Sequence, residues 1–253
     1  MEELFEVYKP TVFRDYLKCV SALKDEVTIN LSPIEIRINE MDPSHVAMVN
    51  LVLPNTFFDS YEVSDTLKLS LNLKDTLSLL NKIDKDDILK VFYDKDALKL
   101  MFQIQGTKSL TRNKTISTLE PIEEECPQPK IFFKSKSKIL LDSFKFAIED
   151  LAKNMQHIRF ESTNDKLNLI GDSDLGHEET PIPKDSDIML EHRVEEDSKA
   201  TFTASYLVDI LKNTSKVSEV VTIELSEDMP LRLEMELPIG KLEFYLAPNI
   251  GCT

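Results

Sequence analysis

A short helix followed by a β-hairpin is the unit that most constrains the fold, because it recurs four times along the chain. Each expected hairpin has two strand-like segments around a polar turn, and these hairpins lie at 26–41, 89–106, 157–172 and 220–237. An amphipathic helix is expected before each hairpin, at 10–24, 72–83, 138–153 and 204–215. The second and fourth units align well with each other, so we predict that the chain consists of two similar halves.

The segment STLEPIEEECPQPK, residues 117–130, separates the two halves. Its three prolines and four glutamates are the composition of an extended linker. We therefore predict an N-terminal domain at 1–117, a connecting linker at 118–130 and a C-terminal domain at 131–253. Each domain should pack two helices on antiparallel sheets, which is an α+β fold.

Acidic side chains outnumber basic ones by 45 to 30, and the net charge of −15 argues against a protein that binds phosphates over its whole surface. The predicted helices qualify this argument, because a helical wheel places basic residues opposite each apolar stripe. These residues are Arg14, Lys18, Lys74, Lys82, Lys145, Lys153, Lys212 and Lys216. On the third helix, Lys145 and Lys153 share this face with Asp142 and Glu149. Four such faces side by side would form one basic stripe that steers DNA to a single surface. For any single helix, an ordinary solvated face is the alternative interpretation.

The sequence has no pattern typical of an enzyme, a metalloprotein or a membrane protein. It lacks a phosphate-binding glycine loop, a nucleophile elbow and the histidine or cysteine spacing of a zinc site. No signal peptide and no long apolar run are present, and three scattered cysteines suit a reducing compartment. We therefore expect a soluble intracellular protein that is not an enzyme and needs no cofactor or metal.

Two segments, MDPSHVAMVNLVLP at 41–54 and FYLAPNI at 244–250, carry a family resemblance. Together they resemble the DNA sliding clamps of archaea and eukaryotes, the proliferating cell nuclear antigen family. The resemblance runs from about residue 4 to residue 250, and the D-P-S-H-V and Y-L-A-P pieces are specific in combination.

This resemblance implies two similar domains in each subunit and three subunits in a closed ring, with helices lining the hole. The ring would encircle duplex DNA and act as a processivity factor, without catalytic activity of its own. Polymerase, nuclease and ligase would dock through short hydrophobic peptides, and an ATP-driven loader would place the ring on DNA. The expected location is the cytoplasm, associated with the nucleoid, or the nucleus in a eukaryote.

The resemblance also implies a pocket for the partner peptide beside the linker. Carried over by position, its residues are Met41, His45, Val46, Ile122, Pro230, Tyr245, Leu246, Ala247 and Pro248. An apolar floor beside a proline-stiffened linker suits an anchored, extended peptide. The alternatives are that Val46 and Leu246 belong to the core and that His45 is a hydrogen-bonded structural histidine.

For DNA contact, the resemblance supports Lys18, Lys24 and Lys212. Lys24 falls toward the apolar stripe of its helix, but it is close enough to the helix end to extend outward. Phe146, Glu149 and other residues stand where clamps often place basic side chains. We therefore expect weak, sequence-independent and salt-dependent contact with phosphates.

Subunits of this family join through edge strands, which here would be 106–116 and 172–184. The first edge carries Lys108, Arg112 and Lys114, and the second carries Asp172, Asp174, Glu178 and Glu179. Opposite charges favour head-to-tail association. Pro181 and Pro183 cannot donate to a strand ladder, so a heterotrimer is the alternative to the expected homotrimer.

A checkpoint-type or regulatory clamp-fold subunit that does not slide freely on DNA is the alternative function. Such a protein should diverge at the peptide pocket. The presence of D-P-S-H-V and Y-L-A-P favours the replicative clamp.

Overall fold

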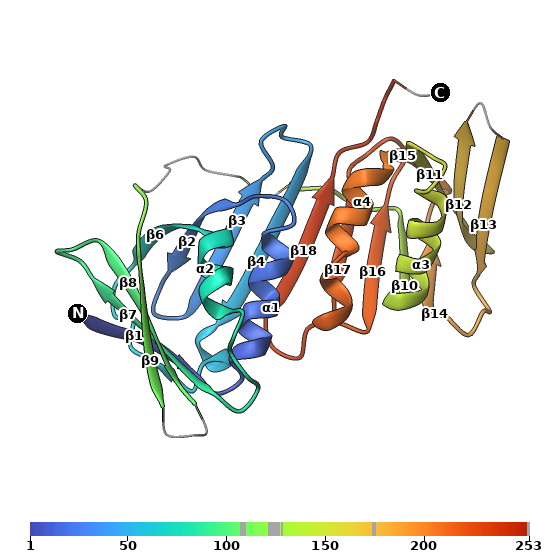
Figure 1. Ribbon diagram of the computed structural model, residues 1–253. Helices are drawn as coiled ribbons and strands as arrows, with labels where there is room; N and C mark the ends of the chain where they lie inside the picture. The colour runs from blue at the N-terminus through green and yellow to red at the C-terminus, as the bar shows by residue number, and fades with distance from the viewer. Residues whose placement is uncertain (107–109, 121–126, 128, 174–175, 252–253) are drawn as a thin grey trace. The chain divides into compact units, whose positions relative to one another are not determined.

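The computed structural model describes residues 1–106, 110–120, 127, 129–173 and 176–251, and they belong to two compact units. Unit 1 consists of 1–40, 49–126 and 238–241, and unit 2 consists of 41–48, 127–237 and 242–253. Each unit contains two α-helices and two groups of antiparallel strands, so the chain has the predicted α+β character (Figure 1).

Unit 1 has one five-stranded sheet in the order β5-β1-β7-β8-β9. Its strands are β1 (Glu2–Val7), β5 (Ser60–Tyr61), β7 (Ile88–Asp94), β8 (Lys99–Gln105) and β9 (Thr111–Ser117). A second group in the order β4-β3-β2-β6 comprises β2 (Glu26–Leu31), β3 (Glu35–Met41), β4 (Ala47–Pro54) and β6 (Leu67–Asn72). Helices α1 (Pro10–Val20) and α2 (Leu73–Leu80) pack against each other, and the short 3-10 helix η1 (Asn55–Phe57) follows β4.

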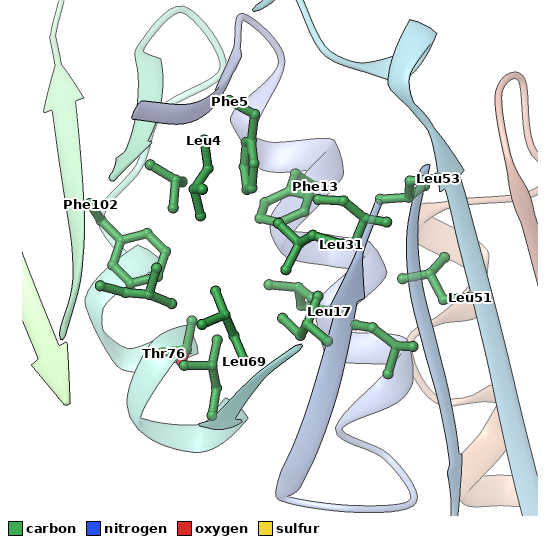
Figure 2. A pocket seen from close by; sticks show the side chains of 16 residues that line it. Leu4, Phe5, Phe13, Leu17, Leu31, Leu51, Leu53, Leu69, Thr76 and Phe102 are labelled. Carbon is green, nitrogen blue, oxygen red and sulfur yellow. The ribbon is translucent and has the colours of Figure 1, made fainter. Parts of the chain in front are cut away.

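Apolar side chains from α1 and from both groups of strands fill the core of unit 1. They enclose a small cavity of about 30 Å³ that is lined by carbon, as Figure 2 shows for Phe5, Phe13, Leu31 and Phe102. Thr76 also lines this cavity, but its hydroxyl donates to the Asn72 carbonyl at 2.8 Å. The cavity therefore offers no polar partner and is expected to stay dry.

Unit 2 repeats this plan. One group of strands has the order β14-β10-β16-β17-β18, with β10 (Ser135–Leu140), β14 (Met189–Val194), β16 (Val220–Leu225), β17 (Leu231–Met235) and β18 (Lys241–Leu246). The other has the order β13-β12-β11-β15, with β11 (His157–Thr163), β12 (Lys166–Ser173), β13 (Gly176–Pro183) and β15 (Ser198–Thr203). Helices α3 (Leu141–Leu151) and α4 (Ala204–Leu211) pack against each other, and the 3-10 helix η2 (Thr214–Lys216) follows α4.

All four predicted hairpins are confirmed, but the predicted helices were too long. The largest error is at α3, which was expected to begin at residue 138, whereas 138–140 belong to strand β10. Buried and half-buried residues alternate from Ser135 to Leu140, and β10 pairs with β14 on one side and β16 on the other. This period of two is that of a strand, and the amphipathic pattern of α3 begins after it.

None of the helices in the described ranges is long and apolar enough to cross a membrane.

Candidate functional site

The D-P-S-H-V segment forms a tight loop between β3 and β4 that is organised by Asp42. The Asp42 carboxylate accepts hydrogen bonds from the backbone amides of Ser44, Val46 and Ala47, at 2.9, 2.7 and 2.6 Å. Its own amide donates to the Ala47 carbonyl at 2.9 Å, and the His45 amide donates to the Asp42 carbonyl at 2.9 Å. The side chain and the backbone of Asp42 therefore both hold the two ends of the loop together.

Helix α4 also contributes to this loop, because the Tyr206 hydroxyl donates to Asp42 Oδ2 at 2.8 Å. The Asp42 residue is 5% exposed, and such burial acts to raise its pKa. The amide and hydroxyl donors favour the charged form more strongly, so the pKa of Asp42 lies below its ordinary value. The loop is thus held by a buried carboxylate that stays charged at neutral pH.

His45 lies at the tip of the loop with a left-handed backbone, at φ 56°. Histidine is among the residues that adopt this conformation more readily than most others. Its side chain is exposed, and no hydrogen-bond partner for the imidazole is found in the part of the chain that the structure describes. The geometry therefore gives no support to the alternative that His45 is a hydrogen-bonded structural histidine.

The Y-L-A-P segment meets the loop at the end of β18. The Ala247 amide donates to the Val46 carbonyl at 2.8 Å. Leu246 pairs in register with Leu231 at the end of the β17–β18 ladder, and Pro230 and Ala247 directly adjoin these two residues in the sequence. Leu246 is 1% exposed and forms part of the core, which was the alternative considered for it. Met41, Val46, Pro230, Tyr245, Ala247 and Pro248 are half-buried at the surface, and Ile122 lies outside the described residues.

Sequence reasoning missed a charged cluster on the face of β16, β17 and β18 that carries Tyr245. The Arg232 guanidinium bonds to Glu224, Glu234 and Glu243, with Nε 2.7 Å from Glu243 Oε1. Burial acts to lower the pKa of Arg232, but its bonds to Glu224 and Glu243 raise it above the ordinary value. The Tyr245 hydroxyl is 3.4 Å from Glu243 Oε1. The sequence signal that could have indicated this cluster is the charged residues at alternate positions of LRLEM and KLEFYL.

Three of the predicted DNA-binding residues of unit 1 are already paired with carboxylates. Arg14 and Lys18 both contact Asp15 at 3.1 Å, and Arg14 also donates to the Ile83 carbonyl at 3.3 Å. Lys24 does not extend outward as expected but bonds to Glu40 at 2.7 Å. Lys74 and Lys82, in contrast, are exposed and form no ion pair with any described residue.

Helix α3 of unit 2 presents an outer face on which basic, acidic and apolar residues are mixed. Lys145 is half-buried and contacts the Lys212 carbonyl at 3.3 Å, while exposed Lys153 pairs with Asp150 at 2.8 Å. The other exposed positions of this helix are Asp142, Phe146, Glu149 and Asp150. Beyond α3, Lys212 just after α4 and Lys216 in η2 are exposed and form no ion pair among the described residues.

The first predicted subunit edge, β9, is the last strand of its sheet. Arg112 bonds to Asp87 at 2.9 Å and to the Lys82 carbonyl at 3.1 Å, and Lys114 donates to the Leu79 carbonyl at 2.6 Å. Both basic groups therefore interact near the C-terminal end of α2 in their own unit, where the helix dipole favours cations. Lys108 lies outside the described residues.

The second predicted edge, β13, is also a terminal strand (Figure 1). Its Glu178 accepts from Asn154 at 2.8 Å, its Glu179 accepts from Asn168 at 2.6 Å, and Asp172 on β12 bonds to His177 at 2.7 Å. The predicted opposite charges of the two edges are thus largely engaged within the subunit. Asp174 lies outside the described residues.

Strand β13 pairs with β12 without interruption up to Pro183. Pro181 and Pro183 have the same parity along the strand, so their backbone groups point to the same side. A proline facing β12 would interrupt this ladder, which places both missing donors on the free side. A strand added to β13 would therefore find donors at His177 and Glu179 but not beyond them.

Comparisons with known proteins agree with this geometry. A family model described as Rad9 matches residues 13–190, and one described as the C-terminal domain of proliferating cell nuclear antigen matches residues 133–250. The DNA polymerase sliding clamp of Methanococcus vannielii is 30% identical over 245 residues, covering 94% of this chain and 96% of that protein. DNA polymerase sliding clamp 1 of Pyrobaculum aerophilum is 28% identical over 239 residues, covering 94% of each chain.

A solved structure supports the same relationship. The crystal structure of a PCNA2-PCNA3 complex from Sulfolobus tokodaii contains a chain that matches with a TM-score of 0.87 and 25% identity. The match covers 97% of this chain and 98% of that one. Because these similarities span almost the entire length, this chain belongs to the archaeal-type DNA polymerase sliding clamp family, that of proliferating cell nuclear antigen, whose members are not enzymes.

Proposed function

We propose that this chain is one subunit of a three-membered ring that encircles duplex DNA and tethers a replicative polymerase and repair enzymes to it. The domains would be 1–117 and 131–253, joined by the linker 118–130. The ring would reside where the DNA is, and nuclease, ligase and an ATP-driven loader would use the same docking site. The observation that carries this proposal is the junction of D-P-S-H-V with Y-L-A-P at the bond between Val46 and Ala247.

The junction has the chemistry of a peptide anchor site. Apolar side chains of Val46, Ala247 and Pro248 are half-buried around it, and buried Leu246 forms its floor. Apolar anchors in desolvated pockets supply most of the affinity in peptide recognition. Partner proteins with a short hydrophobic anchor segment would therefore bind here. The catalytic activity would belong to those partners and not to this chain.

Substitution of Ala247 by arginine tests this site, because it adds a long charged side chain but keeps the backbone amide that bonds to Val46. We expect Ala247→Arg to weaken binding of a short fluorescent peptide with Leu and two adjacent Phe as its anchor by about tenfold or more, measured by anisotropy. Ala97→Arg, in the exposed turn between β7 and β8, is the matched control and should bind like the wild type. Equal affinity of the Ala247→Arg variant would refute the pocket.

DNA contact would come mainly from lysines that have no carboxylate partner in the described residues: Lys74, Lys82, Lys212 and Lys216. Arg14, Lys18, Lys145 and Lys153 would have to exchange their present partners for phosphates. Few unpaired cations mean few released counterions, so affinity for DNA should be weak and independent of sequence. Such contact suits a ring that slides.

A homotrimer is the first candidate assembly, and a heterotrimer is the second. The free edge of β13 favours the second, because two missing donors limit its pairing with a copy of β9. The Sulfolobus tokodaii complex of two differently named subunits shows that a chain of this fold can associate with a non-identical one. The match to the Rad9 model supports a regulatory clamp-fold subunit as the alternative function.

A further inference from the structure

Tyr206 links helix α4 to the loop that carries one wall of the candidate peptide pocket. Its hydroxyl donates to Asp42 Oδ2 at 2.8 Å, although the two residues are 164 positions apart in the sequence. Asp42 belongs to unit 2 together with Tyr206, so the contact lies within one compact unit. Asp42 opens the D-P-S-H-V motif, but neither Asp42 nor Tyr206 lies among the predicted pocket residues.

The Asp42 carboxylate depends on several donors at once. A buried charge is costly unless hydrogen bonds replace the water that it has lost. Three backbone amides of the loop supply such bonds, and Tyr206 supplies one from a different element. The backbone amides move with the loop, whereas the hydroxyl is attached to α4, whose Leu207 and Ile210 are fully buried. Tyr206 is therefore the contact that fixes the carboxylate relative to the helix.

The position of Asp42 in turn determines the position of the pocket wall. Asp42 Oδ1 accepts from both Val46 and Ala47, and the Val46 carbonyl accepts from Ala247. A shift of the carboxylate would therefore move Val46 relative to the Y-L-A-P segment. We propose that Tyr206 is a positioning residue for partner binding, which holds the D-P-S-H-V loop in its binding conformation through Asp42. This inference rests on the proposed peptide pocket.

Removal of the single hydroxyl by Tyr206→Phe tests the role. We expect the variant to bind the Leu-Phe-Phe peptide about tenfold more weakly, which is the lower end of what loss of one hydrogen bond to a charged group predicts. Tyr61→Phe is the matched control, because the Tyr61 hydroxyl also donates hydrogen bonds, to the carbonyls of Ser32 and Glu35 in unit 1. The control should keep wild-type affinity.

A titration of the Asp42 carboxyl carbon by NMR separates positioning from general loss of stability. The Tyr206 donor lowers the pKa of Asp42, so its removal should move the titration midpoint upward. Asp209, which acts on Tyr206 from the same helix, and His45 in the loop are unchanged in both proteins. The loop, formed above this midpoint and lost as the pH falls through it, should therefore fail at a higher pH in the variant, and peptide affinity should fall with it.

A double-mutant cycle with Asp42→Asn completes the test. If Tyr206 acts through Asp42, Tyr206→Phe should have little further effect on peptide affinity in the Asp42→Asn background. An unchanged affinity and titration midpoint in Tyr206→Phe, together with a strong effect of Ala247→Arg, would overturn this inference and leave the pocket intact. Loss of the Ala247→Arg effect would instead overturn the proposed pocket itself.

Discussion

Arg232 lies at the centre of a cluster of charged residues in unit 2. Its side chain is 13% exposed, and Glu243 beside it is 1% exposed. Three carboxylates surround one guanidinium, so the cluster keeps a net negative charge. A buried carboxylate retains its charge only while a partner compensates for lost hydration. Arg232 thus makes it possible for β16, β17 and β18 to carry glutamates on adjacent strands.

Replacement of this arginine should destabilise the fold strongly. Arg232→Leu would leave buried Glu243 without its cation next to Glu224 and Glu234, and we expect a loss of about 3–5 kcal/mol in the free energy of unfolding. Urea denaturation would measure it. Arg193→Leu is the matched control, because the Arg193 side chain is 79% exposed and pairs with Glu191 at 2.8 Å. Loss of that surface pair should cost less than about 1 kcal/mol.

The two arginine variants should also differ in their response to pH. Without Arg232, burial and like charges would raise the pKa of Glu243 in the folded state above its unfolded value. An acid with a raised folded pKa becomes less destabilising as the pH falls, so Arg232→Leu should regain part of its stability on mild acidification. Equal losses in the two variants at neutral pH would contradict the role assigned to Arg232.

At the scale of elements, the alternation of apolar and polar residues was sufficient to predict the hairpins. Hairpin β7–β8 is an example, because Leu89 and Val91 are buried and pair with Ile104 and Phe102. Helix ends were less predictable: residues 138–140 were expected to open the third helix, but Lys138 and Ile139 pair with β14 and β16. Whether a segment joins a sheet depends on neighbouring strands that are distant in the sequence.

The candidate site was predictable in part for a related reason. The loop and the Y-L-A-P segment are continuous sequence motifs, so resemblance to a family was enough to find them. Contacts between distant elements, such as Tyr206 with Asp42, leave no periodic signal. The ion pairs of Arg14 and Lys24 were also missed, because a helical wheel gives the direction of a side chain but not its partner on another element.

The cavity in unit 1 permits a test of packing between its helix and strands. Val91 is 2% exposed and lines the cavity, so Val91→Ile would place one extra methyl group in empty space. We expect a gain of about 0.5–1 kcal/mol in the free energy of unfolding, measured by the urea midpoint.

Val221→Ile is the control for this cavity. Val221 is fully buried in β16 and does not line the unit 1 cavity. The same extra methyl group should overpack its surroundings there and cost about 1 kcal/mol or more. A loss of stability in Val91→Ile as large as that in the control would show that the cavity cannot accept the group.

At the scale of the whole molecule, the proposed association of subunits would depend on the free edge of β13. We expect the purified protein to form a trimer of 29.0 kDa subunits by light scattering, and the trimer to dissociate on dilution. Pro181→Val combined with Pro183→Val would restore two backbone donors to this edge, so the double variant should dissociate at a lower concentration than the wild type.

Two outcomes would contradict these expectations on assembly. A monomer or dimer that persists at high concentration would exclude the homotrimer and direct the search to sister subunits. An unchanged dissociation concentration in the double variant would show that residues 181–183 do not take part in the joint. Leu190→Ser, at an exposed position on β14, changes a different edge strand and serves as the control.

In the proposed ring, the two prolines would also make the two ends of the joint between subunits unequal in strength. A strand paired with β13 would accept backbone hydrogen bonds from His177 and Glu179 but would receive none from Pro181 onward. The two strands would therefore separate first at the proline end, because no backbone N–H of β13 has to give up a hydrogen bond there. A loader that opens the proposed ring could separate the two strands from that end and break one hydrogen bond at a time. The sequence of β13 itself would then determine where the kinetic barrier to ring opening is lowest.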